Sequence, residues 1–201
     1  MNPDLDQHLQ GRLDGLCQEG VEMAARFDEE VRSQQWHPFL PANYQVVLQA
    51  LIQYRASDTR FLEWGSATGV ITIMADLLGY EAFGIELDAD LVETARELAT
   101  RNDSKARFAA GSFLPTAYRW EPESGDGRMG TIGEGTAGYD ELGHQLPELD
   151  VVFAFPWDGE VDMMVDLMRT HGGKDATLLV NMANQGVHEY RGGERVLPAI
   201  A

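Results

Sequence analysis

The 201-residue sequence predicts an α/β domain in which helices cover both faces of a mostly parallel sheet, a doubly wound arrangement. Three observations lead to this prediction. The run 61–70 reads as a short apolar strand, a glycine loop and the start of a helix. A second strand, 82–85, follows one helix later and ends at Glu86. The run 176–182 is almost continuously apolar, which is typical of a parallel strand buried on both faces.

Further segments complete the expected alternation of strands and helices. Gly65 and Gly69 permit a tight turn and close packing of the following helix on the sheet, and Gly79 ends that helix. Partial helical stripes before residue 58 predict an N-terminal helical extension. The other predicted elements are helices at 70–78 and 161–168, strands at 105–110 and from 150 onward, and a weak hairpin with strands at 187–191 and 194–197.

Two carboxylates around the glycine loop indicate a nucleoside ligand. Glu86 lies about twenty residues past the loop, where an acidic side chain can accept hydrogen bonds from both ribose hydroxyls. A dinucleotide normally requires glycine at the middle loop position, where this chain has Ala67. Glu63 at the mouth of the loop would repel a pyrophosphate but attract the ammonium of an amino-acid moiety. S-adenosylmethionine combines such an ammonium with a ribose and with a carboxylate suited to the amides of a helix start.

At these residues the chain resembles the class I S-adenosylmethionine-dependent methyltransferases, whose first motif is an acid before a glycine-rich loop and whose second is an acid after the next strand. The resemblance covers roughly residues 58–182 and implies a Rossmann-like fold. The residues that it assigns to the cofactor are Glu63, Gly65, Ala67 and Gly69 at the methionine end, Glu86 at the ribose, Leu87 and Asp88 beside the adenosine, and Ser112 and Phe113 at the adenine.

The segment 150–157 resembles the fourth motif of that family, which delivers residues to the transfer site. Amino-group methyltransferases commonly have Asn or Asp, two prolines and an aromatic there; this chain keeps Pro156 and Trp157 but has Ala154 in place of the polar residue. We expect Pro156 and Trp157 to line the acceptor site, where Trp157 would stack on a substrate or cover the sulfonium. Asp158 and Glu160 are the candidate general bases, although a turn and a helix start explain the same residues.

Composition restricts the partners. The formal net charge of −18 disfavours a nucleic acid, because uniform acidity repels a phosphate backbone and no basic patch stands out. A small molecule or a protein is therefore the expected methyl acceptor. The single cysteine, Cys17, has no partner for an internal disulfide, and the sequence implies no metal site. The sequence shows neither a membrane-spanning stretch nor a secretory signal, and we expect a cytoplasmic location.

We expect a helical extension or cap at 1–57 and a Rossmann-like cofactor-binding domain at 58–201. Trp36, His37, Phe39 and Tyr44 of the extension are candidates for substrate contact. A glycine-rich insertion at about 116–147 is either a lid or a segment without a role. The short remainder after the fifth strand indicates a sheet that is abbreviated at its C-terminal edge or completed by a second copy of the chain. A catalytically silent nucleoside-binding or scaffold protein and a dinucleotide oxidoreductase remain as alternatives.

Overall fold

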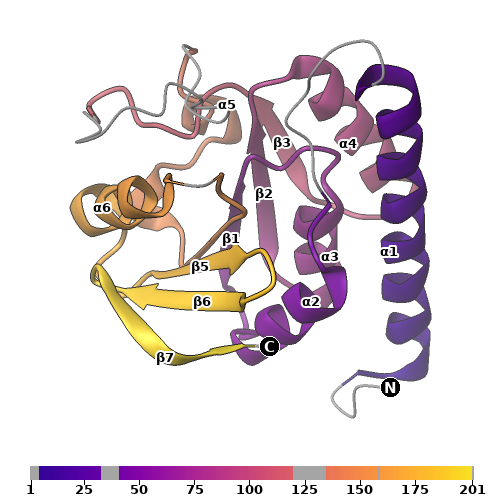
Figure 1. Ribbon diagram of the computed structural model, residues 1–201, viewed down its shortest axis with the longest axis horizontal. Coiled ribbons are helices and arrows are strands. Elements are labelled where there is room, and N and C mark those ends of the chain that lie inside the picture. Colours follow the sequence, from indigo (N-terminus) through magenta and orange to yellow (C-terminus); the bar gives the residue numbers. More distant parts are fainter. Residues whose placement is uncertain (1–4, 33–40, 120–134, 158, 201) are drawn as a thin grey trace.

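The computed structural model describes residues 5–32, 41–119, 135–157 and 159–200. These residues form a seven-stranded sheet in the order β3-β2-β1-β4-β5-β6-β7 (Figure 1). The five strands from β3 to β5 are parallel, and β6 and β7 are antiparallel to their neighbours. The strands are β1 (Arg60–Trp64), β2 (Glu81–Glu86), β3 (Arg107–Ala110), β4 (Val151–Ala154), β5 (Thr177–Met182), β6 (Gly186–Arg191) and β7 (Glu194–Ile200).

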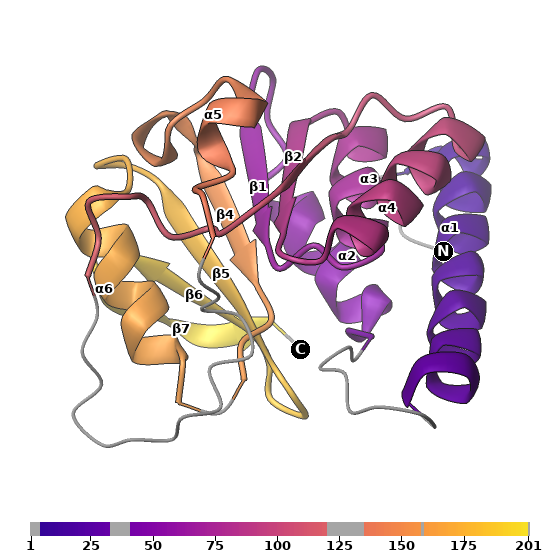
Figure 2. The ribbon, with the colours of Figure 1, turned by 90° about the horizontal axis from the view of Figure 1, so that it is seen from above.

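Helices cover both faces of this sheet (Figure 2): α1 to α4 lie on one side, and α5 and α6 lie on the other. The helices are α1 (Gln7–Phe27), which continues into the π-helical turn η1 (Asp28–Arg32), α2 (Tyr44–Gln53), α3 (Val70–Leu78), α4 (Ala89–Arg101), α5 (Tyr139–Leu142), the 3-10 turn η2 (Leu146–Glu148) and α6 (Val161–His171). The prediction of a doubly wound, mostly parallel α/β fold with N-terminal helices is confirmed.

Alternation along the strands divides the core into two layers, because successive side chains of a strand point to opposite faces. Phe61 and Phe153 pack among the side chains of α1 to α4. Their neighbours Leu62 and Val152 pack on the other face, with α5 and α6. The central strands are thus buried on both faces, which explains why their sequences are almost continuously apolar.

The N-terminal helix α1 packs tightly against α3. Leu13 and Leu16 are fully buried in the layer that also contains α2 and α3. Gly20 permits the close approach, since a Cβ atom at this position would lie 2.8 Å from Cγ2 of Val70 and 3.0 Å from the hydroxyl of Tyr44. Helix α1 therefore supports the first turn of α3 and the first residue of α2.

The carboxyl ends of the parallel strands meet at one edge of the sheet. The chain proceeds outward from β1 to β2 and β3, and β4 then returns to the other side of β1. Glu63 consequently pairs with Gly84 of β2 on one side and with Phe153 of β4 on the other. Such a reversal of strand order opens a crevice at the carboxyl ends, where open α/β sheets bind ligands.

The C-terminal edge differs from the expectation of an abbreviated sheet. Residues 183–185 join β5 directly to β6, and Gly192 and Gly193 turn the chain into β7. Both glycines have positive φ, at 57° and 88°, so the predicted hairpin is confirmed together with the reason for its glycines. The antiparallel pair is present, and β7 is an exposed edge strand in which Leu197 is 73% exposed.

The glycine-rich segment is only partly described, because 120–134 lie outside the described residues. Its C-terminal part belongs to the folded domain. Tyr139 of α5 is buried, its hydroxyl donates a hydrogen bond to the carbonyl of Phe113 at 2.6 Å, and it accepts one from Nε1 of Trp64 at 3.1 Å. Tyr139 is thus part of the folded core, although the sequence around it is rich in glycine.

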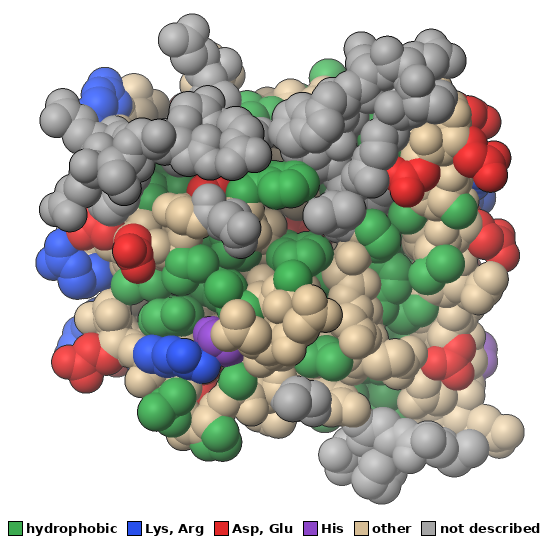
Figure 3. Space-filling model, in the orientation of Figure 1, with side chains coloured by type: hydrophobic (Ala, Val, Ile, Leu, Met, Phe, Trp, Pro, Cys, Tyr) green, Lys and Arg blue, Asp and Glu red, His purple; other side chains and the backbone are tan. Residues whose placement is uncertain are grey.

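The surface of the molecule is unevenly charged. On the face shown in Figure 3, acidic side chains lie mainly toward the edges, and hydrophobic side chains gather toward the middle. None of the helices in the described ranges is both long and apolar enough to cross a membrane.

Candidate functional site

A cavity opens at the carboxyl ends of β1, β2 and β4, where the strand order reverses. It lies where open α/β sheets bind ligands, and both carboxylates that flank the glycine loop are among its lining residues. The residues that line it are Pro41, Ala42, Tyr44, Glu63, Trp64, Gly65, Ser66, Ala67, Thr68, Val70, Ile71, Ile85, Glu86, Leu87, Leu91, Gly111, Phe113, Phe155, Pro156, Trp157 and Met164.

The glycine loop is held against the end of β2. The amides of Gly65 and Ser66 both donate to the carbonyl of Ile85, at 2.9 and 3.0 Å. Gly65 and Gly69 have φ of 70° and 80°, in the left-handed region that favours glycine. A Cβ atom at Gly69 would lie 2.7 Å from the ring of Phe108, so this glycine also permits the close helix–sheet contact that the sequence predicts.

Glu63 joins the loop to the helix that follows it. Its Oε2 accepts hydrogen bonds from the amide of Thr72 at 2.9 Å and from the hydroxyl of Thr72 at 2.5 Å. The side chain lines the cavity but is only 5% exposed. Burial raises the pKa of the Glu63 carboxyl to about 8, while the hydrogen bonds from Thr72 lower it and the charge of Glu86 raises it further. This oxygen therefore caps the first turn of α3, a role that the sequence does not reveal.

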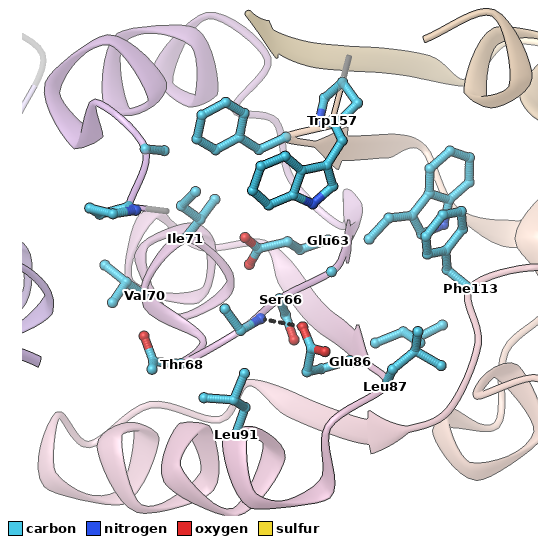
Figure 4. Close-up of a pocket in the computed structure, with 18 of the residues that line it drawn as sticks. Glu63, Ser66, Thr68, Val70, Ile71, Glu86, Leu87, Leu91, Phe113 and Trp157 are labelled. Carbon is cyan, nitrogen blue, oxygen red and sulfur yellow. Dashed lines mark hydrogen bonds between the residues drawn. The ribbon is translucent and has the colours of Figure 1, made fainter. Parts of the chain in front are cut away.

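Glu86 is fixed by backbone amides at both of its oxygens. Oε2 accepts from the amide of Ala67 at 2.9 Å, and Oε1 accepts from the amide of Asp88 at 3.1 Å. The first contact joins the end of β2 to the middle of the glycine loop, as Figure 4 shows. Ala67 adopts a positive φ of 44° at this point. Since each carboxylate oxygen can accept more than one hydrogen bond, Glu86 retains acceptor capacity toward the cavity.

Of the residues expected around an adenosine, some line the cavity and others do not. Leu87 and Phe113 line the cavity, and the ring of Phe113 stacks on Trp64 with centroids 5.1 Å apart. Asp88 caps α4, accepting from the amides of Asp90 and Leu91. Ser112 is buried but does not line the cavity, and its hydroxyl accepts from the amide of Leu114 at 3.1 Å. This hydrogen bond is typical of a local turn formed by a serine.

The segment after β4 forms the opposite wall. Phe155, Pro156 and Trp157 all line the cavity, and Trp157 lies across it from Glu86 and Leu91 (Figure 4). Glu160 is buried, does not line the cavity, and accepts the amide of Trp157 at 2.9 Å, so it shapes this turn instead of facing a substrate. Asp158 lies outside the described residues, as do Trp36, His37 and Phe39.

Tyr44, the remaining candidate from the N-terminal extension, is brought into the site. It lines the cavity at the start of α2. Burial raises the pKa of the Tyr44 hydroxyl, and the negative charge of an ionised Glu63, which lines the same cavity, adds to the rise. The sequence did not indicate three further residues of the site: Leu91 and Met164, which line the cavity, and Thr72, which donates hydrogen bonds to Glu63. Of these, only the hydroxyl of Thr72 in the first turn after an acidic loop carries a recognisable signal.

In the described part of the chain, no three His, Cys, Asp or Glu side chains gather in a way that could hold a metal ion. The charged groups of the cavity that are described are Glu63 and Glu86.

Comparison with known proteins relates this geometry to methyltransferases. No family model matches the chain. The ribosomal protein L11 methyltransferase of Thermus thermophilus is 32% identical over 69 residues, which are 34% of this chain and 27% of that protein. The chain thus matches only about a quarter of the length of this curated relative.

Two solved structures are also similar to the chain. An RNA methyltransferase from Salinibacter ruber in complex with S-adenosyl-L-homocysteine is similar with a TM-score of 0.50 at 18% identity, over 70% of this chain and 76% of that one. A precorrin-6y C5,15-methyltransferase from Geobacter metallireducens is similar with a TM-score of 0.48 at 16% identity, over 72% of this chain and 64% of the other.

The chain has the Rossmann-like fold of the class I S-adenosylmethionine-dependent methyltransferases. The resemblance inferred from the glycine loop and the two acids is confirmed at the level of the fold.

Proposed function

We propose that this protein is an S-adenosylmethionine-dependent methyltransferase that acts on a small molecule or a protein. The observation that carries the proposal is the fixed carboxylate of Glu86. Backbone amides of Ala67 and Asp88 hold its two oxygens at the mouth of a cavity, beside a glycine loop that opens a helix. An anchored acceptor at this place suits the two hydroxyls of a ribose.

The rest of the cavity fits the other parts of the cofactor. Helix starts leave their first amides without intrahelical partners, and Val70 and Ile71 at the start of α3 line the cavity, where a carboxylate would be favoured. Leu87 and Phe113 offer apolar surface to an adenine. The raised pKa keeps Glu63 largely protonated in the free protein at neutral pH, and an ammonium placed beside it would favour loss of this proton and so gain a negative partner. One oxygen of Glu63 also serves Thr72. When bound, the cofactor would supply an activated methyl group, and these residues would orient it and exclude water.

A dinucleotide is less well supported. Ala67 stands at the loop position where close approach to a pyrophosphate normally requires glycine, and two carboxylates border the cavity. The structural relative in complex with S-adenosyl-L-homocysteine supports the choice of cofactor, and the similarity to the L11 methyltransferase supports an enzymatic role.

Calorimetry on the purified chain tests the proposal. S-adenosyl-L-homocysteine and S-adenosylmethionine should bind the wild type, and Glu86→Gln should weaken both by about ten-fold or more, because hydrogen bonds to a charged acceptor are strong. Glu93→Gln, an exposed site on α4, is the matched control and should bind like the wild type. Absence of binding by the wild type contradicts the proposal, and binding of NAD in its place would favour an oxidoreductase.

One observation favours a catalytically silent nucleoside-binding protein as the second candidate. Ala154 and Phe155 stand in place of the polar residue and the first proline of the fourth motif. The candidate base Glu160 accepts a hydrogen bond from the amide of Trp157 and so stabilises the turn. Cofactor binding without methyl transfer to any acceptor would be the result expected of that candidate.

A further inference from the structure

The two sides of the cavity differ in chemistry. Strands β1 and β2 contribute both carboxylates, Glu63 and Glu86. The lining also includes three aromatic side chains, Tyr44 from the start of α2 and Phe155 and Trp157 after β4, together with the mainly apolar Pro41, Ala42, Pro156 and Met164. In Figure 4 the indole of Trp157 stands above Glu63, on the far side of the cavity from Leu91. An acceptor entering beside the methionine end of the cofactor would meet this aromatic wall, formed by Tyr44, Phe155 and Trp157.

No lysine or arginine is among the described residues that line the cavity. Basic side chains of the neighbouring strands are engaged elsewhere. Arg60 and Arg107 both form ion pairs with Glu81. These three residues begin strands β1, β3 and β2 respectively, so they lie at the amino ends of the strands, opposite the cavity. The described part of the site therefore offers the acceptor no basic side chain that could pair with a phosphate or carboxylate group.

The aromatic wall is held in place by the fold. The turn that carries Trp157 is fixed by Glu160, which is 4% exposed and accepts the amide of Trp157. Tyr44 is buried at 7% exposure and is backed by Gly20 of α1. A wall supported in this way can select a substrate by shape and by the attraction of aromatic faces for cations.

We propose that the methyl acceptor is an amine nitrogen carried by an apolar, phosphate-free molecule that binds against the aromatic wall of Tyr44, Phe155 and Trp157. This inference rests on the proposed function. In the transfer, the lone pair of an uncharged amine forms the new nitrogen–carbon bond while the carbon–sulfur bond breaks and its electron pair remains on sulfur. The positive charge passes from sulfur to nitrogen, and the product ammonium later releases its proton to solvent.

The environment suits this movement of charge. A positive charge is present before and after the step, and it stays between aromatic faces and carboxylates throughout. An oxygen acceptor would instead have to be activated as an anion, next to Glu63 and Glu86 and without a described cation to stabilise it. A nucleic-acid acceptor would bring phosphates to the same wall.

Binding of small probes to the protein saturated with S-adenosyl-L-homocysteine tests the inference without relying on turnover. The probes are benzyltrimethylammonium and benzyl phosphate, which share the aromatic group and differ in charge, and ligand-observed NMR measures their affinities. We expect the ammonium to bind at least about ten-fold more tightly than the phosphate. Trp157→Leu should abolish this preference, whereas Tyr54→Leu, at the distant end of α2, should retain it.

The outcomes separate this inference from the proposed function. Failure of S-adenosyl-L-homocysteine to bind refutes the function itself. If that ligand binds but benzyl phosphate binds as well as the ammonium, or the ammonium does not bind up to about 10 mM, the amine proposal is overturned. If the ammonium probe binds as expected, labelled methyl transfer to benzylamine or to a lysine-containing peptide would distinguish a small-molecule amine from a protein amine as the acceptor. Transfer to RNA alone would overturn the proposal.

Discussion

The buried carboxyl of Glu63 should make the stability of the protein depend on pH. Its ordinary pKa of 4.5 is raised to about 8 in the folded protein, mainly by burial. Below pH 4.5 the carboxyl is protonated in both the folded and the unfolded chain. As the pH rises toward 8, the unfolded chain ionises first, so the stability contributed by the protonated group is lost and folding becomes less favourable.

The magnitude follows from the two pKa values. Each pH unit between them costs about 1.4 kcal/mol, so the interval from pH 5 to pH 8 corresponds to about 4 kcal/mol at most. Local relaxation and water entry reduce this amount, and we expect about 2 kcal/mol. Glu63→Gln cannot titrate, and its free energy of unfolding should lack this component.

Urea unfolding of the wild type and Glu63→Gln at several pH values between 5 and 8.5 measures the effect. The difference in the free energy of unfolding should move in favour of the variant as the pH rises. Glu93→Gln, at an exposed site, should follow the wild type. Parallel profiles for the wild type and Glu63→Gln would refute the assignment of a raised pKa to this carboxyl.

Three further predictions concern the same region. Gly20→Ala should destabilise the protein by about 1–3 kcal/mol in urea unfolding, because the new Cβ would lie 2.8 Å from a methyl group of Val70 and 3.0 Å from the hydroxyl of Tyr44. The control Gly15→Ala, whose Cβ would have nothing within 4 Å, should be neutral or stabilising by up to about 1 kcal/mol. Equal effects of the two substitutions would contradict the close contact at Gly20. Thr72→Val should cost about 1–3 kcal/mol by removing the hydroxyl donor to Glu63, and an unchanged unfolding midpoint would show that this hydrogen bond contributes nothing. Binding of S-adenosylmethionine at pH 6.5 should release a proton from Glu63, because the ammonium of the ligand would lower the raised pKa of this carboxyl. Calorimetry in buffers of different ionisation enthalpy measures the release. Binding heats that do not depend on the buffer would argue against an ammonium beside Glu63.

Much of the cofactor region was predictable because its signals are local. Gly65 and Gly69 occupy backbone conformations that favour glycine, and the strand register then determines where Glu86 stands. The same local rules locate α3 and the hairpin around Gly192. Such features depend on a few consecutive residues and on their spacing, so one sequence suffices to find them.

Other features depend on contacts between distant segments and left no local signal. The hydroxyl of Tyr139 bridges Trp64 and the backbone of Phe113, yet its surroundings in the sequence are rich in glycine. The capping of α3 by Glu63 requires the strand and the helix to be in place before the hydrogen bond exists. Ser112 was assigned to an adenine by its position in the chain, while the turn it stabilises directs its hydroxyl to Leu114.

The order of the strands has a consequence for how the chain folds. The pairing of Phe61 with Val151 closes a loop of about ninety residues, whereas β5, β6 and β7 each pair with their neighbour along the chain. Distant pairings are reached slowly and nearby ones rapidly. We therefore expect β1 to β3 and their helices to assemble during synthesis, with the arrival of β4 as the late, rate-limiting event and the C-terminal meander forming directly afterwards.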